Sequence, residues 1–121
     1  MSSIVSTRRV RGSRSGRPIM VLLDLLGRRM ALRILWELAR APRPLTFRAL
    51  QLAAETNPSL LNSRLKELRD AQIIEHNGGY RLSDRGKALV TLILPLHAWA
   101  DDWAAHLKSG RPRSTRASPK A

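Results

Sequence analysis

Residues 46–71 read TFRALQLAAETNPSLLNSRLKELRDA and contain two helix start signals a short distance apart. The first is Thr46, whose hydroxyl can cap a helix that we expect from Phe47 to about Ala54. Leu50 and Ala53 share one face of this helix and would point to the core. The segment therefore begins with a short amphipathic helix.

The second start signal is Asn57-Pro58, because asparagine is a good cap and proline suits the first helical position. The second helix is predicted over Pro58–Ala71, and its apolar residues form one stripe: Leu61, Leu65 and Leu68. Two short helices joined by a tight turn are typical of a helix-turn-helix.

A helix in the DNA major groove reads bases with the side chains opposite its buried stripe. At about 100° per residue, four polar side chains of Pro58–Ala71 fall there: Ser59, Asn62, Ser63 and Lys66. Asn57 and Thr46, at the starts of the two helices, are further candidate DNA contacts. An ordinary amphipathic helix with a solvated face is the alternative interpretation.

Upstream, a helix is predicted over residues 18–26, with a proline at its start and Gly27 as a pause. The proline-rich segment Ala41–Pro44 ends a second helix, expected over Arg28–Arg40. This helix has apolar residues at helical spacing, namely Leu32, Leu35, Trp36 and Ala39.

Downstream, residues 72–76 and Tyr80–Leu82 are predicted as two short strands joined by the turn Asn77-Gly78-Gly79. This hairpin would form a small β wing. Ser83 is expected to cap a long helix that reaches about Lys108.

The long helix carries an apolar stripe at 3-4-3-4 spacing: Leu89, Leu92, Leu96, Trp99 and Trp103. Packing explains its tryptophans better than ligand stacking does, and a second copy of the stripe is the simplest cover, which predicts a homodimer. Pro95 is expected to kink the helix.

His97 and Asp101 would give two metal ligands per subunit, but this spacing often arises by accident, so we expect no metal site.

The 121 residues suffice for one compact domain and carry a net charge of +13, which favours a polyanionic partner. Residues 1–18 and 109–121 contain nine basic residues and no acid. Their Ser, Gly, Pro and Arg composition predicts disordered basic tails on either side of a domain over residues 19–108.

The absence of cysteine excludes disulfides, thiol sensing and cysteine-ligated metals, and is typical of a reducing cytosol. No apolar run is long enough for a membrane span, and the N-terminal segment lacks the apolar stripe of a transit peptide. We therefore expect a cytoplasmic protein without membrane association. Asp101 and Asp102 are adjacent and cannot face each other on a helix, so we expect neither enzyme activity nor a cofactor.

Five motifs in order resemble the HxlR family of winged helix-turn-helix regulators. They are Leu25-Leu26-Gly27 with Ile34-Leu35-Trp36-Glu37-Leu38, Thr46-Phe47-Arg48-Ala49-Leu50, Leu61-Asn62-Ser63-Arg64-Leu65-Lys66-Glu67-Leu68, Tyr80-Arg81-Leu82-Ser83-Asp84-Arg85-Gly86, and Leu89 through Pro95 to Trp99. The resemblance covers about Leu22–Trp103. It implies a mostly α fold with a small β wing and a long C-terminal dimerisation helix, and a dimer that binds operator DNA through Pro58–Ala71. A MarR-type regulator is the next nearest family and implies nearly the same function.

The sequence departs from the family pattern in three places. It has no cysteine, and Arg29-Met30 stands where Lys-Trp is usual. Thr46 replaces a basic residue, although Arg48 could supply that phosphate contact. The wing is shorter than usual, which puts its minor-groove contact in doubt, and Arg81 either contacts phosphate or is an ordinary exposed strand residue.

The sequence thus predicts a homodimeric, sequence-specific regulator of double-stranded DNA with an inverted-repeat operator. The first alternative is a non-specific nucleic-acid-binding protein, chromatin-like or RNA-binding, whose basic tails supply the affinity. The second is a protein-interaction module that docks through the long helix. A small-molecule effector of unidentified chemistry is a further candidate partner of the regulator.

Overall fold

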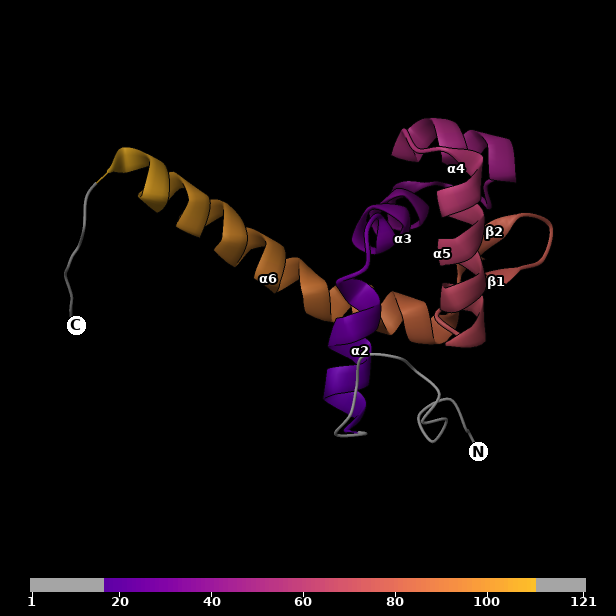
Figure 1. Ribbon diagram of the computed structural model, residues 1–121, viewed down its shortest axis with the longest axis horizontal. Coiled ribbons are helices and arrows are strands. Elements are labelled where there is room, and N and C mark those ends of the chain that lie inside the picture. Colours follow the sequence, from indigo (N-terminus) through magenta and orange to yellow (C-terminus); the bar gives the residue numbers. More distant parts are fainter. Residues whose placement is uncertain (1–16, 111–121) are drawn as a thin grey trace. The chain divides into compact units, whose positions relative to one another are not determined.

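The computed structural model describes residues 17–110 (Figure 1). Its elements are α2 (Pro18–Leu26), α3 (Ala31–Arg40), α4 (Phe47–Ala54), α5 (Pro58–Asp70), β1 (Ile74–His76), β2 (Tyr80–Leu82) and α6 (Asp84–Ser109). This is the predicted mostly helical chain with a small β wing. The described residues divide after Val90 into two units, 17–90 and 91–110, and α6 runs from the first into the second. The predicted disordered tails lie, apart from their inner ends, outside the described residues.

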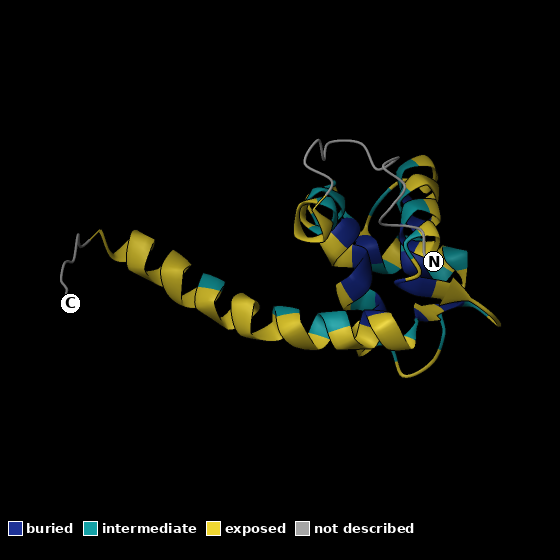
Figure 2. Ribbon diagram, turned by 90° about the horizontal axis from the view of Figure 1, so that it is seen from below, coloured by how far each residue is buried: buried dark blue, intermediate teal, exposed yellow. Residues whose placement is uncertain are grey.

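The core lies entirely in the first unit, since every buried residue of the described chain falls between Ala31 and Gly86 (Figure 2). The predicted stripe of α5 is at its centre, with Leu61, Leu65 and Leu68 fully buried. Burying each such side chain contributes about 1.5–3 kcal/mol relative to leaving it in water. The rotation of α5 about its axis is therefore fixed by its own apolar residues.

Helix α3 differs from the prediction in where it begins. The sequence predicted a start at Arg28, but the helix begins at Ala31 because Met30 takes a left-handed conformation with φ 72°. Gly27 itself is right-handed, with φ −79°, and its N–H bonds to Leu23 at 2.9 Å. Helix α2 ends at Leu26 with Gly27 as its C-terminal cap, as the sequence predicted, and the turn between the two helices extends to Met30.

The buried face of α3 also differs from the predicted stripe. Leu35 is buried as expected, but Leu32 and Trp36 are 47% and 38% exposed, and Ala39 is exposed too. The stripe that packs against α4 and β2 is rotated by about one residue and comprises Ala31, Ile34, Leu35 and Leu38. Two overlapping apolar stripes share Leu35, and the one that is buried in the core is the stripe without the tryptophan.

The wing is a hairpin in which β1 and β2 pair antiparallel, with Glu75 opposite Arg81. The first strand is two residues shorter than predicted, because Gln72 adopts φ 62°. A third segment, which the sequence pattern did not predict, joins the sheet: Leu45 exchanges two backbone hydrogen bonds with Tyr80, at 2.8 and 3.0 Å. The wing is thereby attached to the linker that leads into α4.

Ser83 joins the end of the hairpin to the start of α6. Its hydroxyl donates to the carbonyl oxygens of Gln72 and Ile73, at 2.8 and 2.9 Å, and accepts from the N–H of Gly86 at 3.0 Å. Its own N–H also donates to Ile73, at 3.0 Å. The predicted cap is confirmed, and it also holds the first turn of α6 against the chain that leaves α5.

Helix α6 continues through Pro95 to Ser109. The kink expected at this proline stays a prediction. No helix in the part of the chain that the structure describes is long and apolar enough to cross a membrane.

A substitution at Gly86 tests how closely the first turn of α6 packs against Ile73. A Cβ at position 86 would collide with the Ile73 carbonyl oxygen, so Gly86→Ala should lower the free energy of unfolding by about 1–3 kcal/mol. At an open helix position the same change would raise stability by about 1 kcal/mol. Urea unfolding followed by circular dichroism measures the difference, with the exposed neighbour Arg85→Ala as control. A Gly86→Ala protein as stable as wild type would contradict this packing.

Candidate nucleic-acid interface

Helix α5 presents a polar face to solvent. Because its leucine stripe is buried, the opposite side of the helix is exposed. All four side chains predicted to point outward are exposed: Ser59, Asn62, Ser63 and Lys66. Hydroxyl, amide and ammonium groups are the donors and acceptors that match base edges in a major groove. The structure thus brings these four predicted residues together on one surface.

Two of the predicted basic contacts form ion pairs within the chain. Lys66 Nζ lies 3.3 Å from Asp70 Oδ2, and Arg81 Nε lies 3.1 Å from Glu75 Oε2 on the wing. Both pairs are exposed, and exposed pairs contribute only about 0–1 kcal/mol. Either cation can therefore exchange its carboxylate for a phosphate at little cost.

Thr46 and Asn57 act first as helix caps. Thr46 Oγ1 accepts from the N–H of Ala49 at 3.0 Å, and Asn57 Oδ1 accepts from the N–H of Leu60 at 2.8 Å. Their oxygens are occupied, but the hydroxyl proton and the amide NH₂ group remain available as donors. The two residues position α4 and α5 and leave a donor at each helix start, where an anion is favoured.

Three exposed arginines lie along the chain between the end of α3 and the first turn of α4. Arg40, Arg43 and Arg48 are exposed and form no ion pair with any acidic residue that the structure describes. Only Arg48 was predicted as a contact. The signal for the other two is an acid-free stretch from 38 to 54, over which the three cations have no compensating charge. These groups suit a phosphate backbone better than base edges.

Arg64, although it lies on α5, belongs to the framework. Its Nε donates to the Arg29 carbonyl at 2.8 Å, and its Nη1 reaches both carboxylate oxygens of Glu67, at 3.0 and 3.1 Å. Arg28 adds a second cation to Glu67, at 3.6 Å. These contacts attach α5 to the turn between α2 and α3 and fix its direction.

The second unit contains the exposed part of the predicted dimerisation stripe. Leu92, Leu96, Trp99 and Trp103 are 51–74% exposed, whereas Leu89, in the first unit, is half-buried against the core. The rings of Trp99 and Trp103 stack with centroids 5.7 Å apart. Each turn of this segment therefore shows an apolar side chain to water.

The residues considered for metal binding form only a pair. His97 Nδ1 lies 3.4 Å from Asp101 Oδ2. Among the described residues no group of three or more candidate ligands comes together.

Comparison with known proteins identifies relatives of the chain. The model of the HxlR-like helix-turn-helix family matches residues 25–108. The crystal structure of the quinone-bound YodB from B. subtilis is 29% identical, with a TM-score of 0.63, and the match covers 69% of this chain and 96% of that one. Among curated proteins, none matches.

A second solved structure shares the fold. It is described as a possible HxlR family transcriptional factor from Thermoplasma volcanium GSS1, is 21% identical, and superposes with a TM-score of 0.65 over 74% of this chain and 86% of that one. At this identity the likeness concerns the fold alone.

Proposed function

The chain belongs to the HxlR-like helix-turn-helix family and is a DNA-binding transcription regulator, and from this premise we propose that it reads a specific inverted-repeat operator with α5 as a homodimer. The observation that carries the proposal is the outward face of α5, where Ser59, Asn62, Ser63 and Lys66 are all exposed opposite a fully buried leucine stripe. Such a helix can enter a major groove with its donors held in register.

Two groups of side chains are suited to different parts of the DNA, the bases and the phosphate backbone. Asn62 and Ser63 are short and stand on a helix whose rotation is fixed, so they suit base edges. Arg43 and Arg48 lie near the start of α4 and suit phosphate, which fixes the position of the protein but carries no sequence information. Base selectivity should therefore depend on α5, and sequence-independent affinity on the arginines.

Substitutions on the two surfaces should separate these roles. Asn62→Ala or Ser63→Ala should weaken binding to a duplex selected from random sequences by about 1–3 kcal/mol, while binding to random DNA barely changes. Arg48→Gln should weaken both and flatten the plot of log affinity against log salt by about 0.9. Fluorescence anisotropy at several salt concentrations measures both quantities.

Two results would contradict the assignment. The first is a selection from random duplexes that returns no symmetric consensus, with specific and random affinities equal at physiological salt; this would favour the non-specific basic-tail alternative. Equal losses on both duplexes for Asn62→Ala and Arg48→Gln would mean that α5 does not read bases.

Dimerisation through α6 is proposed from the exposure of its stripe. Leu92, Leu96, Trp99 and Trp103 give a continuous apolar face, which a soluble monomer rarely leaves uncovered. The same face on a second copy is self-complementary about a two-fold axis. Two recognition helices would then reach successive major grooves about 34 Å apart.

A charge within the stripe should separate the subunits. Leu96→Glu or Trp103→Glu would bury an unpaired carboxylate, so we expect monomers and much weaker operator binding. Light scattering gives the mass. Ala105→Glu, about 180° around the helix from Leu96, is the matched control and should remain dimeric. A dimeric Leu96→Glu protein would defeat the interface assignment.

An effector that acts on these 121 residues has no cysteine thiol of the chain to react with. The B. subtilis relative is quinone-bound, and quinones are electrophiles that readily add thiolates. Because these 121 residues contain no cysteine, that covalent route is closed to them, and we propose that an effector binds this chain non-covalently.

A further inference from the structure

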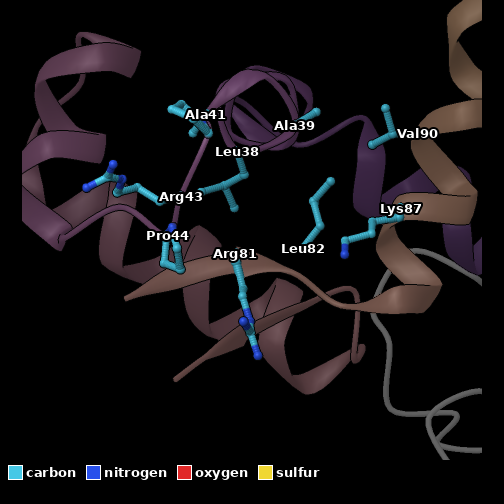
Figure 3. Close-up of a pocket in the computed structure, with 10 residues that line it drawn as sticks. Leu38, Ala39, Ala41, Arg43, Pro44, Arg81, Leu82, Lys87 and Val90 are labelled. Carbon is cyan, nitrogen blue, oxygen red and sulfur yellow. The ribbon is translucent and has the colours of Figure 1, made fainter. Parts of the chain in front are cut away.

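A pocket of about 420 Å³ opens in the first unit between α3, the linker before α4, β2 and the start of α6 (Figure 3). Its size falls within the range of small-molecule sites, about 300–1,000 Å³. Leu38, Leu82 and Val90 give it an apolar wall, and Ala39, Ala41 and Pro42 complete its rim. None of its ten lining residues is acidic.

The pocket exists because the backbone ladder beside β2 stops. Tyr80 exchanges two hydrogen bonds with Leu45, so a continuing ladder would pair Leu82 with Arg43. No backbone hydrogen bond joins these two among the described residues, and the linker departs from the strand through Pro44 and Pro42. By strand alternation, the N–H of Leu82 lies on the same side of β2 as that of Tyr80, toward this gap. A ligand there would meet a backbone donor.

Three basic residues line the pocket, and Lys87 is the one contributed by α6. Figure 3 shows its side chain extending from α6 toward Leu82, whereas the guanidinium groups of Arg43 and Arg81 lie away from the centre. Arg81 is paired with Glu75 at 3.1 Å, so of the two arginines it is Arg43 that raises the positive potential around the pocket. An anionic group would therefore sit between Lys87 and the N–H of Leu82, with an apolar body against Leu38 and Val90.

From this arrangement we infer that the pocket binds a small organic carboxylate with an apolar body, an aromatic or branched aliphatic acid. The carboxylate would accept a charge-assisted hydrogen bond from Lys87 and one from Leu82. Inorganic phosphate lacks the apolar body, and a neutral amide lacks the charge, so both should bind much more weakly. This inference does not rest on operator recognition, because it concerns the protein without DNA.

The test uses benzoate as the probe and benzamide as its uncharged counterpart. Titration into the ¹⁵N-labelled full chain should shift the amide resonances of Leu82, Lys87 and Val90 saturably with benzoate. Benzamide and inorganic phosphate should bind at least about tenfold more weakly, because each removes one of the two kinds of contact. Equal affinity for benzoate and benzamide would overturn the inference.

Two variants locate the site. Lys87→Gln should weaken benzoate about tenfold or more, while Lys108→Gln, the same loss of charge on the same helix, should not change it. Ala39→Leu should fill the pocket and abolish binding although Lys87 is retained. Unchanged heteronuclear spectra away from the pocket show that each variant is folded. Equal losses for Lys87→Gln and Lys108→Gln, or shifts scattered over the basic surface, would mean only non-specific attraction to a cationic protein and would refute the site.

Discussion

Burial of Leu61, Leu65 and Leu68 controls what α5 can do, because a helix with one apolar stripe has only one stable rotation against a core. When that stripe packs against the core, the polar residues on the opposite side of the helix are exposed to solvent. The other α5 contacts support this arrangement. Asn57 fixes where the helix begins, and Arg64 ties its side to the turn before α3. The proposed recognition surface is thus a consequence of core packing.

The position of α5 relative to the wing and to the start of α6 depends on a second, smaller feature. Ile73 lies in the short segment between α5 and β1, and its carbonyl oxygen accepts two hydrogen bonds from Ser83. Gly86 approaches the same carbonyl so closely that a side chain at position 86 would not fit. A similar close approach occurs at Gly79, where a Cβ would meet Pro44 at 2.9 Å and where φ is +117°. Two glycines thereby let the hairpin pack against both of its neighbours.

Local signals carried most of the correct predictions. Thr46, Asn57 and Ser83 each cap the helix that the sequence assigned to them, because capping depends on residues three positions apart. The turn at Asn77–Gly79 and the outward face of α5 follow from patterns of the same short range.

The errors and omissions concern contacts between distant segments. The choice between two apolar stripes of α3 depends on α4 and β2, which no pattern within α3 contains. The pairing of Leu45 with Tyr80 spans 35 residues of sequence and has no local signal. Arg40 and Arg43 were not among the predicted contacts, although the acid-free stretch from 38 to 54 is visible in the sequence, and the structure adds that neither forms an ion pair with a described acidic residue.

The most direct test of the central claim is methylation protection of guanine N7 on the selected duplex, since N7 lies in the major groove. If α5 reads bases in a two-fold symmetric complex, the protein should protect guanines in two major-groove segments on one side of the duplex, about 34 Å apart. Guanines that remain fully reactive throughout the bound duplex, or weak protection spread evenly along it, would contradict recognition by α5.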